Sequence, residues 1–216
     1  MINPMANYRI SFQVYSARNF PPVDAVLQGL AAIGYDAIEP YGGNYMDDPK
    51  GFRSKADALG LAIPTAHVPL QLLDDNRAKA IEIAKTLGLE TVVIPYIAAD
   101  VRPDDAAGWK ALGERIAGHA TALGASGLKL AWHNHDFEYV PLPDGSRPID
   151  HLLAGVPGHA DPMNDIHPWY VLMDVSGQGE PGSLNGTLMN ALSDAMEAGL
   201  IRDAIVAGST AQAARL

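Results

Sequence analysis

The chain has no cysteine, few basic residues and no long hydrophobic run, and each shortage argues against a class of protein. Without cysteine it can form neither disulfides nor thiolate zinc sites. Its 15 Lys and Arg against 25 Asp and Glu give a formal net charge of -10 at pH 7. This argues against nucleic acid as a partner, because a phosphate backbone is bound through basic surface. We also expect no membrane partner and a cytoplasmic location, since no apolar run reaches the length of a spanning helix and the first residues lack a secretory-signal pattern.

Two enzyme motifs are also missing from the sequence. There is no glycine-rich phosphate loop between a strand and a helix, and no Gly-x-Ser-x-Gly elbow, so nucleotide hydrolysis and serine hydrolase chemistry have no support. The composition that is present is ordinary for a globular protein, with 48% hydrophobic and 19% charged residues. At 216 residues, we expect one domain spanning 1–216.

A recurring junction dominates the sequence, in which an Ala- and Leu-rich helical segment stops at a glycine and a short apolar segment follows. The junction glycines are Gly34, Gly60, Gly88, Gly127 and Gly199. Glycine just past a helix end adopts the left-handed conformation without a Cβ penalty. The first three recur at intervals of 26 and 28 residues, the length of one strand plus one helix with their loops. This period predicts parallel strands joined by crossover helices.

The repeat places the elements along the chain. We predict strands at 8–14, 37–38, 62–66, 91–94, 128–132 and 169–173, with a weaker seventh candidate at 204–206. We predict helices at 21–33, 49–59 and 76–87, a fourth ending near Gly124, and two more at 146–154 and 184–197.

The densest chemistry follows the fifth predicted strand. There the apolar run Leu128 to Trp132, expected to be buried, is followed by His133, Asn134, His135 and Glu138. The period of two puts the two histidines on one face of the extended chain and Asn134 on the other. Imidazole and carboxylate together suit Mn, Fe, Co or Zn better than Ca, and an imidazole beside a metal can act as a general base. The alternative is an exposed polar loop whose histidines satisfy backbone groups.

Other polar residues follow neighbouring predicted strands. Glu39 follows the second strand, His67 the third and Asp174 the sixth. In parallel α/β folds the carboxyl ends of the strands converge on the ligand site, so we expect these side chains to share one site. Taken singly, Glu39 could be a solvated carboxylate or could orient a substrate hydroxyl, and His67 could be a satisfied core histidine. Asp174 ends an apolar run, where a charge usually has a partner.

Two arginines and four histidines complete the candidates. Arg18 and Arg102 lie in loops on the same rim, where they could meet a phosphate or carboxylate of a substrate or face solvent. The remaining histidines are expected at the surface: His119, His151, His159 and His167.

Four segments resemble the sugar phosphate isomerase/epimerase family, whose members share the xylose isomerase-like barrel. These segments are FQVYSAR (12–18), GYDAIEPYG (34–42), AH (66–67) and WHNHDFEY (132–139). The resemblance covers residues 8–153 well, whereas 154–216 are atypical. It implies the α/β class and a parallel (β/α) TIM-type barrel. Because 42 residues follow Asp174 and no histidine follows His167, we expect an incomplete barrel of six to seven strands. An incomplete barrel exposes its edge strands, so a homo-oligomer is one expected state.

The resemblance also implies a function and a site. It implies a sugar isomerase or epimerase that moves a proton next to a carbonyl, with a small-molecule sugar or sugar phosphate as substrate and a divalent metal (Mn, Co, Fe, Mg or Zn) as cofactor. By resemblance, Glu138 and Asp174 hold the metal. The expected catalytic residues are Glu138, His133 and His135. The expected substrate-binding residues are Glu39, His67, Asn134 and Arg18.

Two other functions stay open at the level of sequence. The family's histidine after the seventh strand and glutamate after the eighth have no match here, which favours a catalytically impaired or non-catalytic relative that binds a sugar or a partner protein. A metal-dependent DNA phosphodiesterase is disfavoured by the acidic balance of the chain.

Overall fold

The computed structural model of the chain describes residues 10–156 and 183–206. The chain divides into two units, Met1–Val156 and Pro157–Leu216. The segment that resembles the isomerase family lies almost entirely in the described part of the first unit. The strand expected at 169–173, Asp174, His159 and His167 lie outside the described residues, and a single domain over 1–216 stays a prediction.

The described part of the first unit, residues 10–156, contains five parallel strands that follow one another in chain order. They are β1 (Ser11–Gln13), β2 (Ala37–Glu39), β3 (Thr65–His67), β4 (Thr91–Ile94) and β5 (Lys129–Trp132). β1 pairs with β2, and β3, β4 and β5 form a second parallel sheet. Isolated parallel bridges, Ala37 with Ala62 and Tyr41 with His67, join the two sheets. The described residues thus form mixed α/β structure with parallel strands and no closed barrel, which confirms the expected incomplete barrel.

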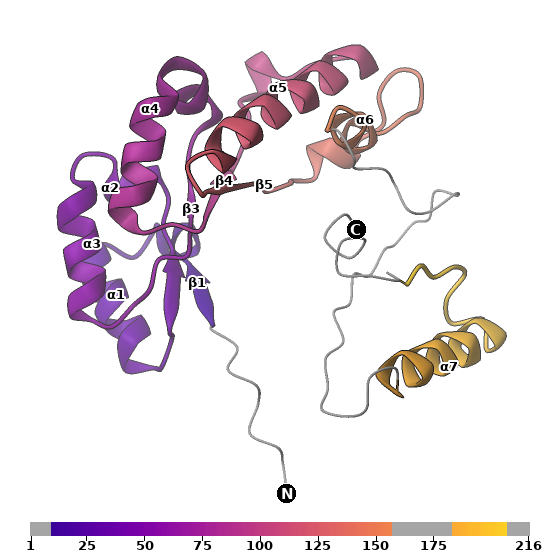
Figure 1. Cartoon of the computed structure of the whole chain (residues 1–216), viewed down its shortest axis with the longest axis horizontal. Coiled ribbons are helices and arrows are strands. Elements are labelled where there is room, and N and C mark those ends of the chain that lie inside the picture. Colours follow the sequence, from indigo (N-terminus) through magenta and orange to yellow (C-terminus); the bar gives the residue numbers. More distant parts are fainter. Residues whose placement is uncertain (1–9, 157–182, 207–216) are drawn as a thin grey trace, which may run out of the picture. The chain divides into compact units, whose positions relative to one another are not determined.

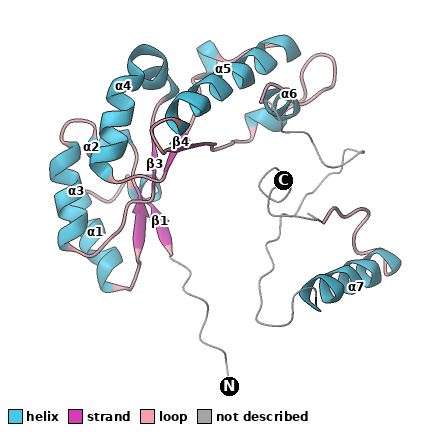
Figure 2. Cartoon of the chain, in the orientation of Figure 1, coloured by secondary structure: helices cyan, strands magenta, loops and turns pink. Residues whose placement is uncertain are grey.

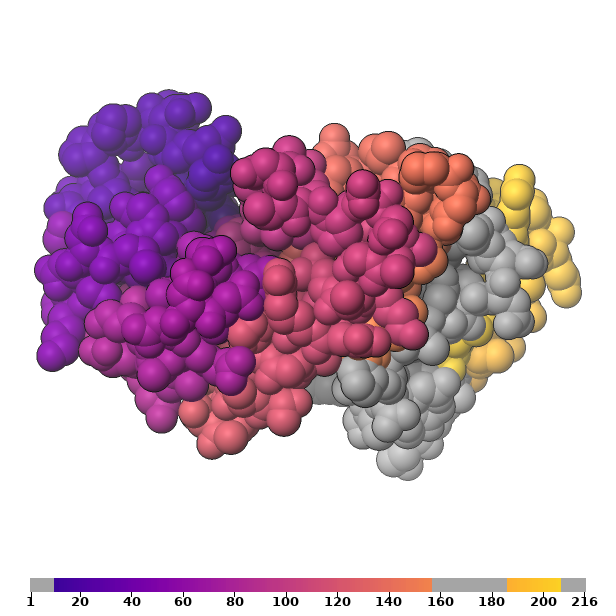
Figure 3. Space-filling model, turned by 90° about the horizontal axis from the view of Figure 1, so that it is seen from above, coloured from indigo at the N-terminus to yellow at the C-terminus, as the bar shows by residue number. Residues whose placement is uncertain are grey.

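Helices alternate with these strands and lie along one side of them (Figures 1 and 2). The α-helices of the unit are α1 (Val23–Ala32), α2 (Gly42–Tyr45), α3 (Pro49–Ala58), α4 (Leu70–Leu87), α5 (Ala106–Gly124) and α6 (Pro148–Ala154). Three 3-10 turns complete it: η1 (Val14–Ala17), η2 (Ala99–Val101) and η3 (Phe137–Tyr139). In the space-filling view, the atoms of this unit, from indigo to orange, form one continuous surface (Figure 3).

The two faces of the strands differ in polarity, as the period of two requires. One face packs into the hydrophobic core with the helices, through Phe12, Ile38, Ala66, Val92 and Leu130. The alternating positions, which share register across the strands, are Gln13, Glu39, His67, Val93 and Ala131. The polar residues at the ends of β1, β2 and β3 therefore lie on the face opposite the helices.

The predicted glycine junctions are confirmed, because all five glycines have positive φ, between 68° and 95°. In the second unit, α7 (Ser183–Glu197) ends before Gly199 as expected. The strand predicted at 204–206 is wrong, because no strand is present from 201 to 206. There the Ala204 N–H donates to Asp203 Oδ1 at 2.8 Å, which occupies an amide that a strand would need for pairing.

Two predicted elements differ from the structure, and one helix of the structure has no predicted counterpart. The helix expected from Asn76 begins at Leu70, and Asn76 is a kink within it, with φ -152° and its side chain accepting from the Lys79 N–H at 3.0 Å. The Asn76 side chain therefore caps the second part of the helix from a position inside it. The short helix α2 was not predicted. The fifth strand is not fully buried as expected, because Lys129 is exposed and Leu130 to Trp132 are half-buried.

His119 was expected at the surface, and this prediction is wrong, because its side chain is buried on α5. Its Nδ1 accepts from Arg77 Nε at 3.0 Å, so its Nε2 carries the proton that Asp74 Oδ1 accepts at 2.9 Å. Both partners lie on α4. The imidazole is buried because α4 supplies a donor and an acceptor for its two nitrogens. His151, by contrast, is half-buried and contacts the Ser146 hydroxyl at 2.7 Å.

Within residues 10–156 and 183–206, no helix combines the length and the apolar character needed to cross a membrane.

Candidate functional site

The candidate site lies at the carboxyl ends of the strands. Gln13, Glu39 and His67 are the last residues of β1, β2 and β3, and His133 follows the last residue of β5. The His133 N–H donates to the Ile94 carbonyl at 3.0 Å, which extends the pairing of β4 with β5 by one residue. Rigid strand ends therefore position four of the polar side chains.

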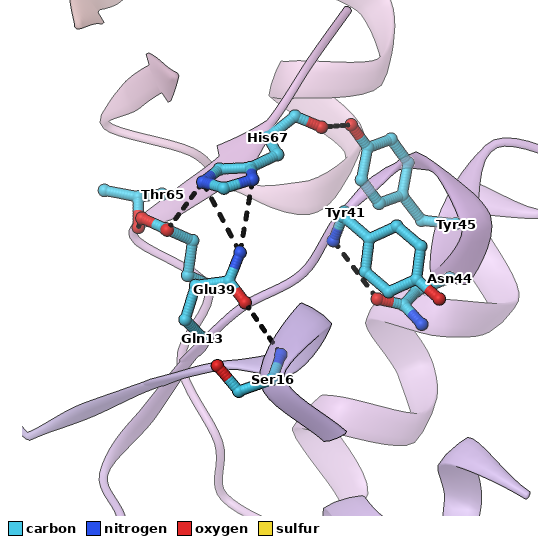
Figure 4. A network of polar contacts seen from close by, with 8 residues as sticks. All are labelled: Gln13, Ser16, Glu39, Tyr41, Asn44, Tyr45, Thr65 and His67. Atoms are coloured by element: carbon cyan, nitrogen blue, oxygen red, sulfur yellow. Dashed lines mark hydrogen bonds and ion pairs between the residues drawn. The ribbon is translucent and has the colours of Figure 1, made fainter. Parts of the chain in front are cut away.

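An ionised carboxylate and an imidazole form the centre of the site (Figure 4). His67 Nε2 lies 3.0 Å from Glu39 Oε1, and the Thr65 hydroxyl donates to Glu39 Oε2 at 2.5 Å. The hydrogen bond from His67 is the main cause that lowers the pKa of Glu39; partial burial opposes it, and the bond from Thr65 adds to it. Glu39 is therefore an anion at neutral pH.

Gln13 completes this network from β1 (Figure 4). Its side-chain Nε2 lies 3.2 Å from His67 Nδ1, and its Oε1 accepts from the Ser16 N–H at 3.2 Å. The Tyr45 hydroxyl donates to the His67 carbonyl at 2.5 Å, and burial raises the pKa of Tyr45, so this phenol stays protonated. His67 is held through its ring and through its backbone.

Three imidazoles lie in a row from β3 to the loop after β5. The ring centroids of His67 and His133 are 5.0 Å apart, and those of His133 and His135 are also 5.0 Å apart. Partial desolvation and then the proximity of His67 and His135 lower the pKa of His133, while Glu39 and Glu138 partly offset this. His133 is exposed and neutral at pH 7, the state in which an imidazole can accept a proton.

Glu138 lies in η3 and is fully buried. Its Oε1 accepts from the Trp132 indole N–H at 3.1 Å, and its Oε2 accepts from the His135 backbone N–H at 2.7 Å. Each carboxylate oxygen of Glu138 thus accepts a hydrogen bond from the segment that precedes it, residues 132–135. The carboxylate fixes the path of the chain from β5 through the histidines.

A metal site cannot be assembled from the described residues alone. Among residues 10–156 and 183–206 there is no group of three His, Asp or Glu side chains that could hold a metal ion. Glu138 already accepts two hydrogen bonds, and its predicted co-ligand, Asp174, lies outside the described residues. The metal with Glu138 and Asp174 stays a prediction.

The other predicted site residues lie around this centre. Asn134 is exposed, and half-buried His135 stacks on Phe137 with centroids 5.5 Å apart, its Nδ1 buried without a hydrogen-bond partner. Arg18 donates to the Tyr15 carbonyl at 3.0 Å and lies 4.3 Å from the centroid of the Tyr15 ring.

Arg102, the second rim arginine, is tied to its own loop. It donates to the Tyr96 hydroxyl at 2.6 Å and to the Ile97 carbonyl at 2.9 Å, and its guanidinium lies 3.5 Å from the Phe137 ring centroid. These bonds leave part of its guanidinium for other partners, since arginine has five N–H donors.

Gln13 and Thr65, whose side chains contact the side chains of His67 and Glu39, were given no role from the sequence. Gln13 ends β1, but the predicted strand continued to Val14, so the expectation of polar residues at strand ends, which selected Glu39 and His67, did not select it. Thr65 begins β3 and meets Glu39 across the sheet, a pairing that no local sequence signal reveals.

No protein-family model and no curated protein matches the chain. Solved structures do match it. A sugar phosphate isomerase/epimerase from Parabacteroides distasonis has a TM-score of 0.59 at 20% identity, covering 70% of this chain and 63% of its own. A xylose isomerase domain containing protein from Salmonella typhimurium has a TM-score of 0.52 at 14% identity, covering 73% of this chain and 61% of its own. The chain thus spans less than two thirds of these relatives' length, and what it shares with them is the xylose isomerase-like TIM barrel fold, here incomplete.

Proposed function

We propose that the chain is a sugar isomerase or epimerase that moves a proton next to a carbonyl group of a sugar or sugar phosphate. The observation that carries the proposal is the adjacency of anionic Glu39, which can accept sugar hydroxyls, and neutral His133, which can accept a proton. Both groups flank His67, whose Nε2 lies 3.0 Å from Glu39 Oε1 and whose ring centroid lies 5.0 Å from that of His133. The structural neighbours, named as sugar phosphate isomerase/epimerase and xylose isomerase domain proteins, agree with this class.

The proposed reaction divides the work between these groups. Glu39 accepts hydrogen bonds from hydroxyls of the substrate and so fixes its orientation. The neutral imidazole of His133 takes the proton from the carbon next to the carbonyl, and the C–H electron pair forms an enediolate. The protonated His133 exchanges its proton with solvent and then protonates the neighbouring carbon on the same face, while the hydroxyl proton of the enediolate passes to the other oxygen, which gives the isomer. Protonation of the original carbon from the opposite face, by a donor other than His133, gives the epimer. While His133 is protonated, the negative charges of Glu39 and Glu138 stabilise its imidazolium.

The test is exchange of the carbon-bound proton with solvent. We expect the purified protein in deuterium oxide to introduce deuterium next to the carbonyl of D-fructose or D-fructose 6-phosphate, detected by proton NMR. His133→Gln should lower the exchange rate by about 10²-fold or more, the usual size of a general base contribution. His151→Gln, which removes a histidine outside the site, is the matched control and should leave the rate unchanged.

Two results would contradict the proposal. One is the absence of exchange with either compound by the wild-type protein; binding of the sugar without exchange would instead support a non-catalytic sugar-binding relative. The other is equal loss of activity in the His133 and His151 variants, which would show that the substitution acts on folding and not on proton transfer.

The dependence of the exchange rate on pH gives an independent prediction. Because the pKa of His133 is lowered from its ordinary value of 6.5, the base form persists below that pH. We therefore expect the rate to fall to half of its plateau value only below pH 6.5. A half-maximal rate above pH 6.5 would mean that His133 is not the base.

A further inference from the structure

We infer that Arg102 anchors an anion subsite beside the histidine loop, residues 133–138, and that the ligand of the site therefore carries an oxyanion, either a phosphate or a carboxylate. The Tyr96 hydroxyl is the second donor of this subsite. That the rest of the ligand is a sugar depends on the proposed function, whereas the anion subsite depends only on the contacts of Arg102.

Arg102 connects the loop after β4 with the loop after β5. Its guanidinium carbon lies 3.5 Å from the centroid of the Phe137 ring and 5.0 Å from that of the Tyr96 ring. The Tyr96 ring centroid lies 5.2 Å from that of His135, which in turn lies 5.0 Å from that of His133. A continuous series of ring contacts therefore links Arg102 to the imidazole proposed as the base.

The hydrogen bonds of Arg102 determine which edge of its guanidinium is free. Its Nε–H donates to the Ile97 carbonyl at 2.9 Å, and Nη2, on the same edge, donates to the Tyr96 hydroxyl at 2.6 Å. Arg147 presents the same edge to both carboxylate oxygens of Asp150. The opposite edge of Arg102, formed by Nη1 and the second hydrogen of Nη2, has no partner among residues 10–156 and 183–206. Such an edge matches two oxygens of one anion.

The positive charge of Arg102 has no counter-charge in the described part of the chain. Three other arginines there, Arg53, Arg115 and Arg147, form ion pairs with carboxylates, and Arg102 forms none. Its two hydrogen-bond acceptors orient the half-buried guanidinium but are neutral. A guanidinium held by stacking and hydrogen bonds loses little freedom when it binds an anion. Arg102 is therefore a preorganised cation in a protein whose net charge is -10.

Arg18, the other arginine predicted on this rim, lacks these features. It is exposed, and its side chain donates to the carbonyl of Tyr15, three residues earlier in the same turn. Tyr96 adds a donor only at Arg102. Because the oxygen of its hydroxyl accepts from Arg102, its own proton is left to donate to an anion.

The test is equilibrium binding to the full chain, measured by isothermal titration calorimetry at low ionic strength. D-fructose 6-phosphate is compared with D-fructose, and D-glucuronate with D-glucose. We expect at least one anionic compound to bind about 10- to 100-fold more tightly than its neutral counterpart, the usual contribution of a hydrogen bond to a charged group. A preference confined to the phosphate ester or to the glucuronate identifies the oxyanion, and a preference for both supports a subsite that accepts either.

Three variants test the assignment to Arg102. Arg102→Gln should abolish the preference for the anion and leave the affinity for the neutral compound unchanged. Tyr96→Phe removes only the hydroxyl and keeps the ring beside His135, so it should weaken anion binding about fivefold, within the range of one neutral hydrogen bond. Arg115→Gln is the matched control, because it removes an exposed arginine of α5, and it should bind as the wild type does.

Two results would overturn the inference. One is a wild type that binds neither anion more tightly than its neutral counterpart. The other is an Arg102→Gln protein that keeps the preference, including the case in which Arg18→Gln loses it instead. Because binding is measured without turnover, the absence of proton exchange would count against the proposed function and leave the anion subsite standing.

Discussion

Replacing Gly113 with alanine should lower the free energy of unfolding by about 3 kcal/mol, the upper end of the usual cost of overpacking. Gly113 is buried on α5 where that helix packs against α6. A Cβ there would lie 2.1 Å from the carbonyl oxygen of Leu152 and 3.0 Å from the Gly155 Cα. These are backbone atoms that cannot rotate away, so the two helices would have to separate. Urea unfolding followed by circular dichroism measures the change.

Gly118, five residues later on the same helix, is the matched control. It is exposed, and a Cβ added there meets nothing within 4 Å. Because glycine in a helix interior is less favourable than alanine by about 0.5–1 kcal/mol, Gly118→Ala should raise the stability by that amount. The two substitutions are chemically identical and are expected to have opposite signs. Equal effects would mean that α5 and α6 do not pack as closely as the structure places them.

This contact shows what the sequence could and could not reveal. The junction glycines were identified because the requirement for positive φ is local and recurs with the period of the βα unit. Gly113 and Gly155 carry no such pattern, since their φ values are not positive. Their small size matters because two helices separated by a loop approach at these two positions, and that approach is a property of the folded chain.

Buried polar residues illustrate the same limit. His119 was predicted at the surface because no hydrogen-bond partner for a buried imidazole lies near it in the sequence. Its partners, Arg77 and Asp74, are 42 and 45 positions earlier. Local pattern cannot reveal a partner at that distance. By contrast, the alternation of strands and helices was enough to predict that Glu39, His67 and His133 lie together, because the carboxyl ends of parallel strands meet at one edge.

The predicted fold was right in outline for a related reason. Strand β4 has the predicted bounds, Thr91–Ile94, because a short apolar run between a capped helix and a proline leaves little choice. The kink at Asn76 and the exposed Lys129 depart from the predicted helix start and from the predicted burial of the fifth strand. A capping residue can act inside a helix, and a strand paired on one side within the described residues keeps an exposed end.

The second large effect is expected at Glu138, the residue on which the sequence hypothesis placed both metal binding and catalysis. Glu138→Gln should lower the free energy of unfolding by about 2–3 kcal/mol, the cost of one buried donor left unsatisfied. The carboxylate accepts from the Trp132 indole and from the His135 N–H with separate oxygens. An amide has one oxygen, so its NH2 group would face one of these two donors in a fully buried position. Urea unfolding measures this loss.

The same variant tests the predicted metal site. Elemental analysis of the purified proteins measures their metal content, which is separate from their stability. If Glu138 holds a divalent ion with Asp174, the wild type should contain metal and Glu138→Gln should lose it. Asp136→Asn, which changes an exposed carboxylate two residues earlier in the same loop, should change neither stability nor metal content.

A destabilised Glu138→Gln protein with unchanged metal content would make Glu138 a structural carboxylate that shapes the histidine loop. A variant as stable as the wild type would instead contradict the two hydrogen bonds. Because urea unfolding and elemental analysis measure different properties, they separate two roles of this carboxylate. One is the structural role that its two hydrogen bonds indicate, and the other is the metal-binding role that the sequence resemblance implies.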